Sequence, residues 1–297
     1  ILEEAVHSVY DAGYGQKDLS GRKVGVYIGG RAQPSAGMEH ILQAPNPILG
    51  AGQNYLAANI SRFLNVTGPS LVVDTACSSG LIGLSFAKDA LLAGRIDAAL
   101  VGSVSLLLSP SAHRLFGARH ILNENGVFHI FDRESAGEVL GEGAGAVFIK
   151  RLSDAVRDGD RIYGVIKAVS VNNDGRTLGP GSPNIRAQRD AIQTALDMAE
   201  KSPEDIGYIE VNGGGSPIVD SVEIKALSDV YQLNRKTLLP CRIGSVKPNV
   251  GHLLLSSGLA GFIRCVLSVY HKRIPPFLSA REPFEHYDFE ASRIHFN

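Results

Sequence analysis

Cysteine is scarce in this sequence of 297 residues, and tryptophan is absent. The three cysteines, Cys77, Cys241 and Cys265, are widely spaced and form no Cys-x-x-Cys pair. This spacing argues against a zinc site and against a disulfide framework, so we expect no bound metal. Sparing use of cysteine is typical of the reducing cytoplasm, where we expect this protein to work.

An excess of charge of either sign is also missing. The 29 basic and 30 acidic residues leave a net charge of −1, which gives no electrostatic reason to expect a nucleic acid or a membrane as partner. We expect no apolar run long enough to span a bilayer and no signal peptide, because the chain opens at Ile1 on a helical pattern. The length suits one large domain or two small ones.

Strand-like and helix-like segments alternate along the chain. The predicted strands cover 23–29, 71–73, 97–102, 143–149, 162–171, 206–212 and 239–246. The predicted helices cover 1–13, 50–64, 78–93, 151–158, 184–200, 217–230 and 258–271. This alternation predicts an α/β fold with largely parallel, buried sheets. We divide the chain into two halves of similar outline, 1–150 and 151–297, and interpret the irregular residues 172–184 as a functional loop.

A cysteine at a strand-to-helix junction is the first candidate functional residue. The run from Leu71 to Leu81 reads LVVDTACSSGL, with Cys77 at the turn. The start of a helix offers unpaired N–H groups and partial positive charge, and both favour the reactive thiolate. Small neighbouring residues leave room for an acyl group. A buried cysteine that only fills the core is the alternative, and position alone does not decide between them.

Polar residues also follow two predicted strands in the second half. Residues 209–217 read IEVNGGGSP and lead to Asp220 and Glu223, and residues 243–252 read IGSVKPNVGH. His252 at such a place could donate a hydrogen bond to a thioester carbonyl or assist proton movement at the thiol. The other eight histidines are interpreted as structural or exposed.

Four motifs in this order resemble the β-ketoacyl synthase domains of modular polyketide synthases: DTACSS at 74–79, GEG at 141–143, GRT at 175–177 and SVKPNVGH at 245–252. The resemblance implies the thiolase fold, with duplicated halves in α-β-α-β-α layers, and usually a homodimer. It also implies that no cofactor is bound covalently. The substrate would be tethered to acyl carrier proteins, upstream and downstream, through their phosphopantetheine arm.

The same resemblance implies roles for single residues. Cys77 resembles the nucleophile that accepts the acyl chain, and His252 the histidine that supports the thioester carbonyl. Lys247 resembles the lysine that orients the histidine site through Glu223, although a structural ion pair would explain it equally well.

The sequence departs from the family at Asn212. Condensing ketosynthases carry HGTGT where residues 212–216 read NGGGS. In the family, that first histidine and the one matching His252 promote malonyl decarboxylation and hold the enolate. Asparagine can donate a hydrogen bond but exchanges no proton near neutral pH, and losing one such stabiliser costs on the order of a hundred- to a thousand-fold in rate.

We therefore expect a transacylase that passes a chain from one carrier protein to the next without elongation, as in polyketide synthases whose acyltransferases act in trans. The alternatives are a condensing enzyme in which Asn212 replaces the histidine, a non-catalytic dimerisation or docking domain, and, more weakly, a thiolase. A local turn variant is another interpretation of Asn212, because asparagine tolerates left-handed backbone.

Both ends of the chain are expected to be truncated relative to the family. The sequence begins inside a helix and ends at Asn297, before a Gly-Phe-Gly-Gly loop. In the family that loop supplies one oxyanion-hole N–H group, and the other is that of the residue matching Cys77.

Overall fold

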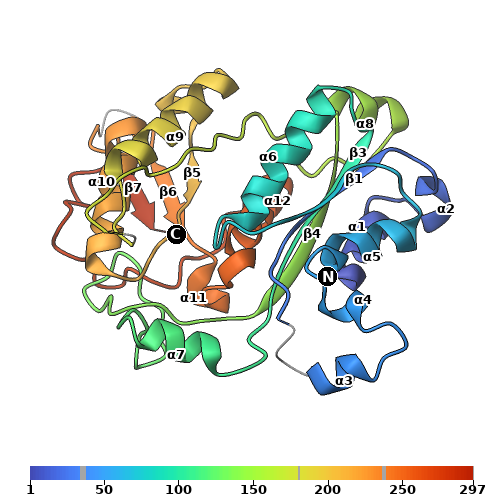
Figure 1. The fold of residues 1–297 in the computed structure, drawn as a ribbon. Helices are drawn as coiled ribbons and strands as arrows, with labels where there is room; N and C mark the ends of the chain where they lie inside the picture. The colour runs from blue at the N-terminus through green and yellow to red at the C-terminus, as the bar shows by residue number, and fades with distance from the viewer. Residues whose placement is uncertain (34–37, 180, 236–238, 297) are drawn as a thin grey trace. The chain divides into compact units, whose positions relative to one another are not determined.

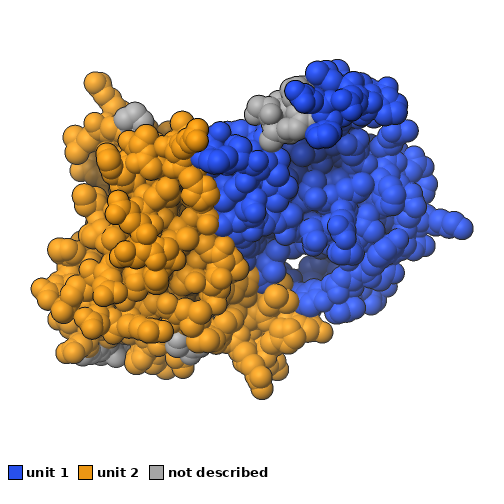
Figure 2. Space-filling model, turned by 90° about the horizontal axis from the view of Figure 1, so that it is seen from below, with its two compact units in different colours: residues 1–112, 141–165, 253–263 blue, residues 113–140, 166–252, 264–297 orange. Residues whose placement is uncertain are grey.

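The protein is described by a computed structural model that covers residues 1–33, 38–179, 181–235 and 239–296. The chain forms two compact units, coloured separately in Figure 2. The first contains residues 1–112, 141–165 and 253–263, and the second contains 113–140, 166–252 and 264–297. Each unit is therefore assembled from three separate segments of the chain.

A four-stranded sheet lies at the centre of the first unit, with the order β2-β1-β3-β4 (Figure 1). Its strands are β1 (Val24–Gly29), β2 (Ser70–Val73), β3 (Ala98–Ser105) and β4 (Gly143–Lys150). β1 pairs in parallel with β2 and β3, whereas β4 runs antiparallel to β3. The predicted parallel sheet is thus confirmed here except at its β4 edge.

The helices of ten residues or more were all predicted, whereas most of the shorter ones were not. In chain order they are α1 (Leu2–Asp11), α2 (Gln16–Leu19), α3 (Met38–Leu42), α4 (Ile48–Ala51), α5 (Tyr55–Leu64), α6 (Ser79–Leu92), α7 (Ser111–Gly117), α8 (Leu152–Asp158), α9 (Ile185–Ala199), η1 (Pro203–Asp205), α10 (Pro217–Tyr231), α11 (Lys247–Val250), η2 (Leu254–Ser256) and α12 (Ser257–His271). The predicted helix over 50–64 begins only at Tyr55, because α4 ends before Gly52 with its extended backbone.

Alternate residues of β1 face different helices. Val26 and Ile28 pack into a buried cluster with residues of α1 and α5. On the opposite face, a Cβ atom on Gly29 would lie 2.8 Å from the backbone nitrogen of Gly80 in α6. Only glycine permits this close approach, which brings the start of α6 directly against the sheet.

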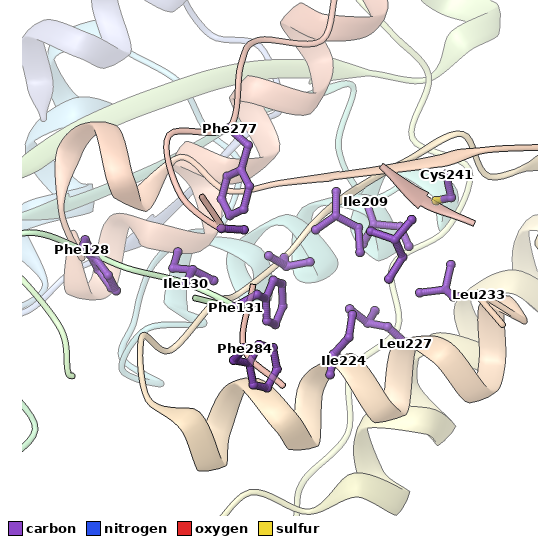
Figure 3. Packing of buried hydrophobic residues seen from close by; sticks show 14 residues of the cluster. Phe128, Ile130, Phe131, Ile209, Ile224, Leu227, Leu233, Cys241, Phe277 and Phe284 are labelled. Carbon is purple, nitrogen blue, oxygen red and sulfur yellow. The ribbon is translucent and has the colours of Figure 1, made fainter. Parts of the chain in front are cut away.

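The second unit contains a three-stranded parallel sheet of β5 (Tyr208–Glu210), β6 (Cys241–Gly244) and β7 (Ile294–Phe296). Its core is a cluster of buried side chains, in which Ile224 and Leu227 point from α10 toward Phe131 and Ile209 (Figure 3). This packing fixes α10, and with it the loop between β5 and α10 that carries Asn212.

The predicted strand over 162–171 is wrong, because the structure assigns no strand to these residues. Their β-branched side chains favour extended backbone, but a strand also needs a hydrogen-bonded neighbour. The boundary between the two units, between residues 165 and 166, falls inside this segment.

We expected no apolar run of membrane-spanning length, and this expectation is wrong when a helix is judged only by its length and composition. Within the residues that the structure describes, Leu254–His271 is one helical stretch of 18 residues with a mean hydropathy of 1.3. A core helix passes the same test, and 39% of this stretch is buried. It also contains the buried Arg264, so it gives only weak support for a membrane.

Candidate active site

Cys77 lies between the end of β2 and the start of α6, at the predicted strand-to-helix junction. It is exposed, so the alternative of a buried, core-filling cysteine is wrong. The preceding residue, Ala76, has a φ of +54°, in the left-handed region that non-glycine residues rarely adopt. The turn that presents Cys77 is therefore conformationally strained and needs support from its neighbours.

Two serine hydroxyl groups supply part of this support. Ser79 Oγ accepts a hydrogen bond from the Thr75 N–H at 2.9 Å and donates one to the Ala76 carbonyl oxygen at 2.6 Å. Ser78 Oγ donates to the Thr75 carbonyl oxygen at 2.9 Å. The serines around Cys77 thus fix the turn.

The space at Gly80 is filled by protein. A Cβ atom on Gly80 would lie 2.9 Å from Leu259 Cβ, and one on Gly258 would lie 2.9 Å from Leu81 Cγ. The expectation that Gly80 leaves room for an acyl group is therefore wrong. Both glycines instead allow the start of α12 to pack against the first turn of α6.

The other two cysteines differ from Cys77 in their surroundings. Cys241 is buried in the core of the second unit, and burial raises its pKa to about 11. Cys265 is half-buried, and desolvation raises its pKa to about 12. Neither thiol is suited to act as a nucleophile near neutral pH.

In the second unit, two carboxylates of α10 hold the loop that carries Asn212. Glu223 accepts hydrogen bonds from the N–H groups of Asn212 and Gly213 at 2.7 and 2.8 Å. Asp220 accepts from Gly214 and Gly215 at 2.8 and 3.1 Å. Burial raises the pKa of both carboxyl groups, and these N–H groups oppose the rise. Two side chains of α10 thus accept hydrogen bonds from the N–H groups of four successive loop residues, 212–215.

The glycines of this loop are needed for its shape. Gly213 has a φ of +56°, and a Cβ atom there would lie 2.6 Å from Ile130 Cγ2. Gly215 has a φ of +66° and similarly little space beside Phe128. Asn212 is not among the residues with positive φ, so its interpretation as a left-handed turn variant is wrong.

Lys247 is buried at the start of α11 and reaches this loop. Its Nζ donates to Asn212 Oδ1 at 3.1 Å and to the Gly213 carbonyl oxygen at 3.3 Å. Lys247 and Glu223 therefore hold the same two residues, one through oxygen atoms and the other through N–H groups. The positive charge of Lys247 also opposes the rise in the pKa of Glu223.

His252 follows α11 and is 2% exposed. Its N–H donates to the Val139 carbonyl oxygen at 2.7 Å, which fixes its backbone. Burial, followed by the positive charge of Lys247, lowers the pKa of His252 to about 3. The imidazole is therefore neutral at pH 7, with one nitrogen as hydrogen-bond donor and the other as acceptor.

A buried pair that the sequence did not point to supports these segments. Glu210 Oε1, at the end of β5, accepts a hydrogen bond from the Val246 N–H at 2.6 Å, and Glu210 Oε2 lies 3.6 Å from Arg264 Nε. Arg264 also donates to the Ser245 carbonyl oxygen. The pair joins the strand end before Asn212 to the residues before Lys247. No motif indicated it, because Arg264 lies within an apolar helical pattern.

The four predicted site residues are distributed over both units. Asn212, Lys247 and His252 belong to the second unit, where Lys247 contacts Asn212 directly, and Cys77 belongs to the first. Among the described residues, His129, Asp132 and Glu134 place potential metal ligand atoms within 4.8 Å of one another. Asp132 already accepts a hydrogen bond from the Glu134 N–H at 3.0 Å, so local structure accounts for its position.

Family comparisons match both halves of the chain. Residues 1–155 match the N-terminal domain of β-ketoacyl synthases, and residues 163–281 match the C-terminal domain. The chain belongs to the β-ketoacyl synthase family, which confirms the thiolase-like α/β fold expected from the motifs. Within that family it is similar to ketosynthase domains of polyketide synthases.

Individual relatives make this similarity specific. Polyketide synthase PksL of Bacillus subtilis is 48% identical over the whole chain, which spans 6% of that protein. The solved ketosynthase from module 6 of the bacillaene synthase of Bacillus subtilis 168 is 38% identical, with a TM-score of 0.92 over the whole chain and 52% of its own length. The oxazolomycin ketosynthase domain OzmH KS8 of Streptomyces albus is 43% identical, with a TM-score of 0.83 over 99% of this chain and 70% of its own.

Proposed function

We propose that this ketosynthase domain takes a polyketide acyl chain from one acyl carrier protein onto Cys77 and passes it to the next carrier protein without decarboxylative elongation. The observation that carries the proposal is the hydrogen bond from Lys247 to the side chain of Asn212. Decarboxylation in the family needs a second histidine at the position of Asn212, and here that position holds an amide that the Lys247 ammonium group keeps in place. The similarity to bacillaene and oxazolomycin ketosynthases supports a polyketide synthase whose acyltransferases act in trans.

Acyl transfer needs only a nucleophile and support for one oxyanion. The Cys77 thiolate attacks the carbonyl carbon of the carrier-bound thioester, and the tetrahedral intermediate expels the phosphopantetheine thiolate. The reverse sequence, with the thiolate of the next carrier protein as nucleophile, releases the chain and restores the Cys77 thiolate. One thioester is exchanged for another, so no carbanion forms and no oxidant or cofactor is consumed.

His252 would support the thioester carbonyl as a neutral hydrogen-bond donor. With a pKa of about 3 it is too weak a base to take the thiol proton near neutral pH. This favours a role at the carbonyl oxygen over a role in proton movement at Cys77.

Decarboxylation requires more stabilisation of negative charge by the site than acyl transfer does. Loss of carbon dioxide from a malonyl thioester leaves an enolate, whose oxygen carries nearly a full negative charge. The family uses two histidines for this step, and Asn212 can neither carry positive charge nor exchange a proton. We therefore expect elongation to be slower than acyl transfer by a factor of about a hundred or more.

One observation favours a second candidate, an active condensing ketosynthase. Because Lys247 occupies the oxygen of the Asn212 amide, both Nδ2 hydrogens are left as donors. Such a donor could replace the histidine in holding the enolate oxygen. Added malonyl-carrier protein distinguishes the two candidates directly.

Intact-protein mass spectrometry of the full-length protein tests the proposal. Incubation with acyl-carrier protein should add the acyl mass at Cys77, and a downstream carrier protein should then remove it. Malonyl-carrier protein should give no extended chain. Cys77→Ala should abolish loading. Chain extension at a rate similar to that of acyl transfer would overturn the proposal in favour of the condensing enzyme.

We also propose that the domain works as a homodimer in the cytoplasm. β2 is an edge strand of its sheet, and its Leu71 is 46% exposed. An exposed apolar edge strand is suited to pairing with a second copy. Sedimentation of the full-length protein should give a dimer, and Leu71→Lys should weaken it. A monomer at micromolar concentration would contradict this.

A further inference from the structure

Arg31 and Asp74 form a two-point ion pair beside the nucleophile turn. Arg31 Nε donates to Asp74 Oδ2 at 2.6 Å, and Arg31 Nη2 donates to Asp74 Oδ1 at 3.1 Å. Arg31 follows β1 and Asp74 follows β2, two neighbouring parallel strands whose carboxyl ends meet at one edge of the sheet. The pair therefore connects these two strand ends where the turn toward Cys77 begins.

Asp74 transmits this contact to the turn itself. Its Oδ1 accepts a hydrogen bond from the Ala76 N–H at 3.2 Å. Ala76 is the residue with left-handed backbone, a conformation that is unfavourable for an L-residue. The Asp74 carboxylate thus stabilises the strained residue that directly precedes Cys77.

The backbone around Arg31 is held in place by Gln53. The Gln53 amide donates to the Gly30 carbonyl oxygen at 2.8 Å, and its Oε1 accepts from the Ala32 N–H at 2.6 Å. Both bonds flank Arg31, so its Cα atom has a fixed position although its side chain is 59% exposed. This anchoring fixes the backbone position from which the guanidinium reaches Asp74.

Asp74 is the charged residue nearest to Cys77 in the sequence of the turn. The first turn of α6 and residues 253–259, which pack against it, contain no titratable side chain. Asp74 stands three residues before Cys77, its Oδ1 bonds the N–H group of the residue next to Cys77, and Arg31 pairs with its carboxylate. A negative charge close to a thiol disfavours the thiolate.

We infer that Arg31 is a positioning residue for the nucleophile: it orients Asp74 to hold the Ala76 turn and cancels the Asp74 charge next to Cys77. This inference rests on the proposed role of Cys77 in acyl transfer. The sequence motif around Cys77 includes Asp74 but not Arg31, which lies 43 residues earlier.

The test measures alkylation of Cys77 by iodoacetamide against pH in the full-length protein, followed by peptide mapping. Arg31→Met should slow alkylation at pH 7 about threefold, the factor that corresponds to a rise of about 0.5 in the thiol pKa. Arg31→Lys should restore part of the rate, because lysine keeps the charge but loses the two-point geometry. Arg62→Met removes a charge from α5 and is the control.

A double variant separates charge from mere structural support. Asp74→Asn keeps an oxygen for the Ala76 N–H and removes the charge, so Arg31→Met with Asp74→Asn should recover most of the wild-type alkylation rate. Equal rates for Arg31→Met and Arg62→Met would overturn the inference, as would a double variant that stays as slow as Arg31→Met. Alkylation needs no acyl carrier, so its pH profile tests Arg31 even if the protein proves unable to transfer acyl chains.

Discussion

Lys247 Nζ lies 3.1 Å from Asn212 Oδ1, and this contact determines which way the Asn212 amide faces. An ammonium group has three donors and no acceptor, so it can only face the amide oxygen. The Nδ2 hydrogens are consequently the part of Asn212 left for a substrate.

Removing the ammonium group should raise the pKa of His252. The positive charge of Lys247 is, after burial, the second cause of the low value of about 3. In Lys247→Met the pKa should therefore rise, yet stay below its ordinary value of 6.5 because the imidazole remains buried. NMR titration of the His252 ring measures this. Lys225→Met, an exposed residue of α10, should leave the value unchanged, and an unchanged value in Lys247→Met would refute the prediction.

The neutral, buried His252 should also make stability depend on pH. Its folded pKa of about 3 lies below the unfolded value of 6.5, so the unfolded chain binds the proton first as the pH falls. The stabilisation is complete above pH 6.5 and declines below it, by about 2 kcal/mol between pH 7 and pH 5. Urea unfolding at the two pH values should show a smaller decline in His252→Gln. His7→Gln, at an exposed position, should behave as the wild type does.

Gly213 should tolerate no side chain. Its φ of +56° and the 2.6 Å approach to Ile130 Cγ2 predict that Gly213→Ala costs about 2–4 kcal/mol in unfolding free energy. Gly207→Ala is a matched control, because a Cβ atom there meets nothing within 4 Å. It should be neutral or slightly stabilising. Similar denaturation midpoints for the two variants would contradict this account of the loop.

Cys77 should be the first cysteine to react. At pH 7.5, pKa values of about 11 and about 12 leave no more than roughly one in a thousand Cys241 or Cys265 thiols ionised. Brief treatment with iodoacetamide, followed by peptide mapping, should find the label at Cys77 alone. Unfolding in urea should expose all three cysteines to labelling. Early labelling of Cys241 in the folded protein would show that its core is more open than described.

Asn212→His should fold normally. Asp220 and Glu223 hold only backbone N–H groups of this loop, so the change should remove just the hydrogen bond that Asn212 Oδ1 accepts from Lys247 and should cost about 1–3 kcal/mol in urea unfolding. A non-elongating domain gains malonyl decarboxylation from it, whereas a condensing domain changes little. Release of carbon dioxide from labelled malonyl-carrier protein provides the measurement, with Asn212→Ala as the inactive comparison.

The sequence predicted the longer helices and most strands, because hydrophobic periodicity and glycine-rich turns act locally. It also indicated Cys77, whose place at the strand-to-helix junction follows from adjacent residues. The strand predicted over 162–171 failed because pairing depends on a partner that no local pattern specifies. The Arg31–Asp74 and Glu210–Arg264 pairs were missed for a similar reason: tertiary packing alone brings together residues separated by 43 and 54 positions.

The hydrogen bonds from the backbone of residues 212–215 to Asp220 and Glu223 have a consequence for evolution. Every amino acid except proline carries the N–H group that Glu223 holds at position 212, so this backbone contact does not depend on the side chain there. A change of a single codon can therefore exchange histidine and asparagine without rebuilding the loop. Under the proposed function, lineages of such domains could lose or regain chain extension repeatedly, and an engineer could reassign a module by the same one-residue exchange.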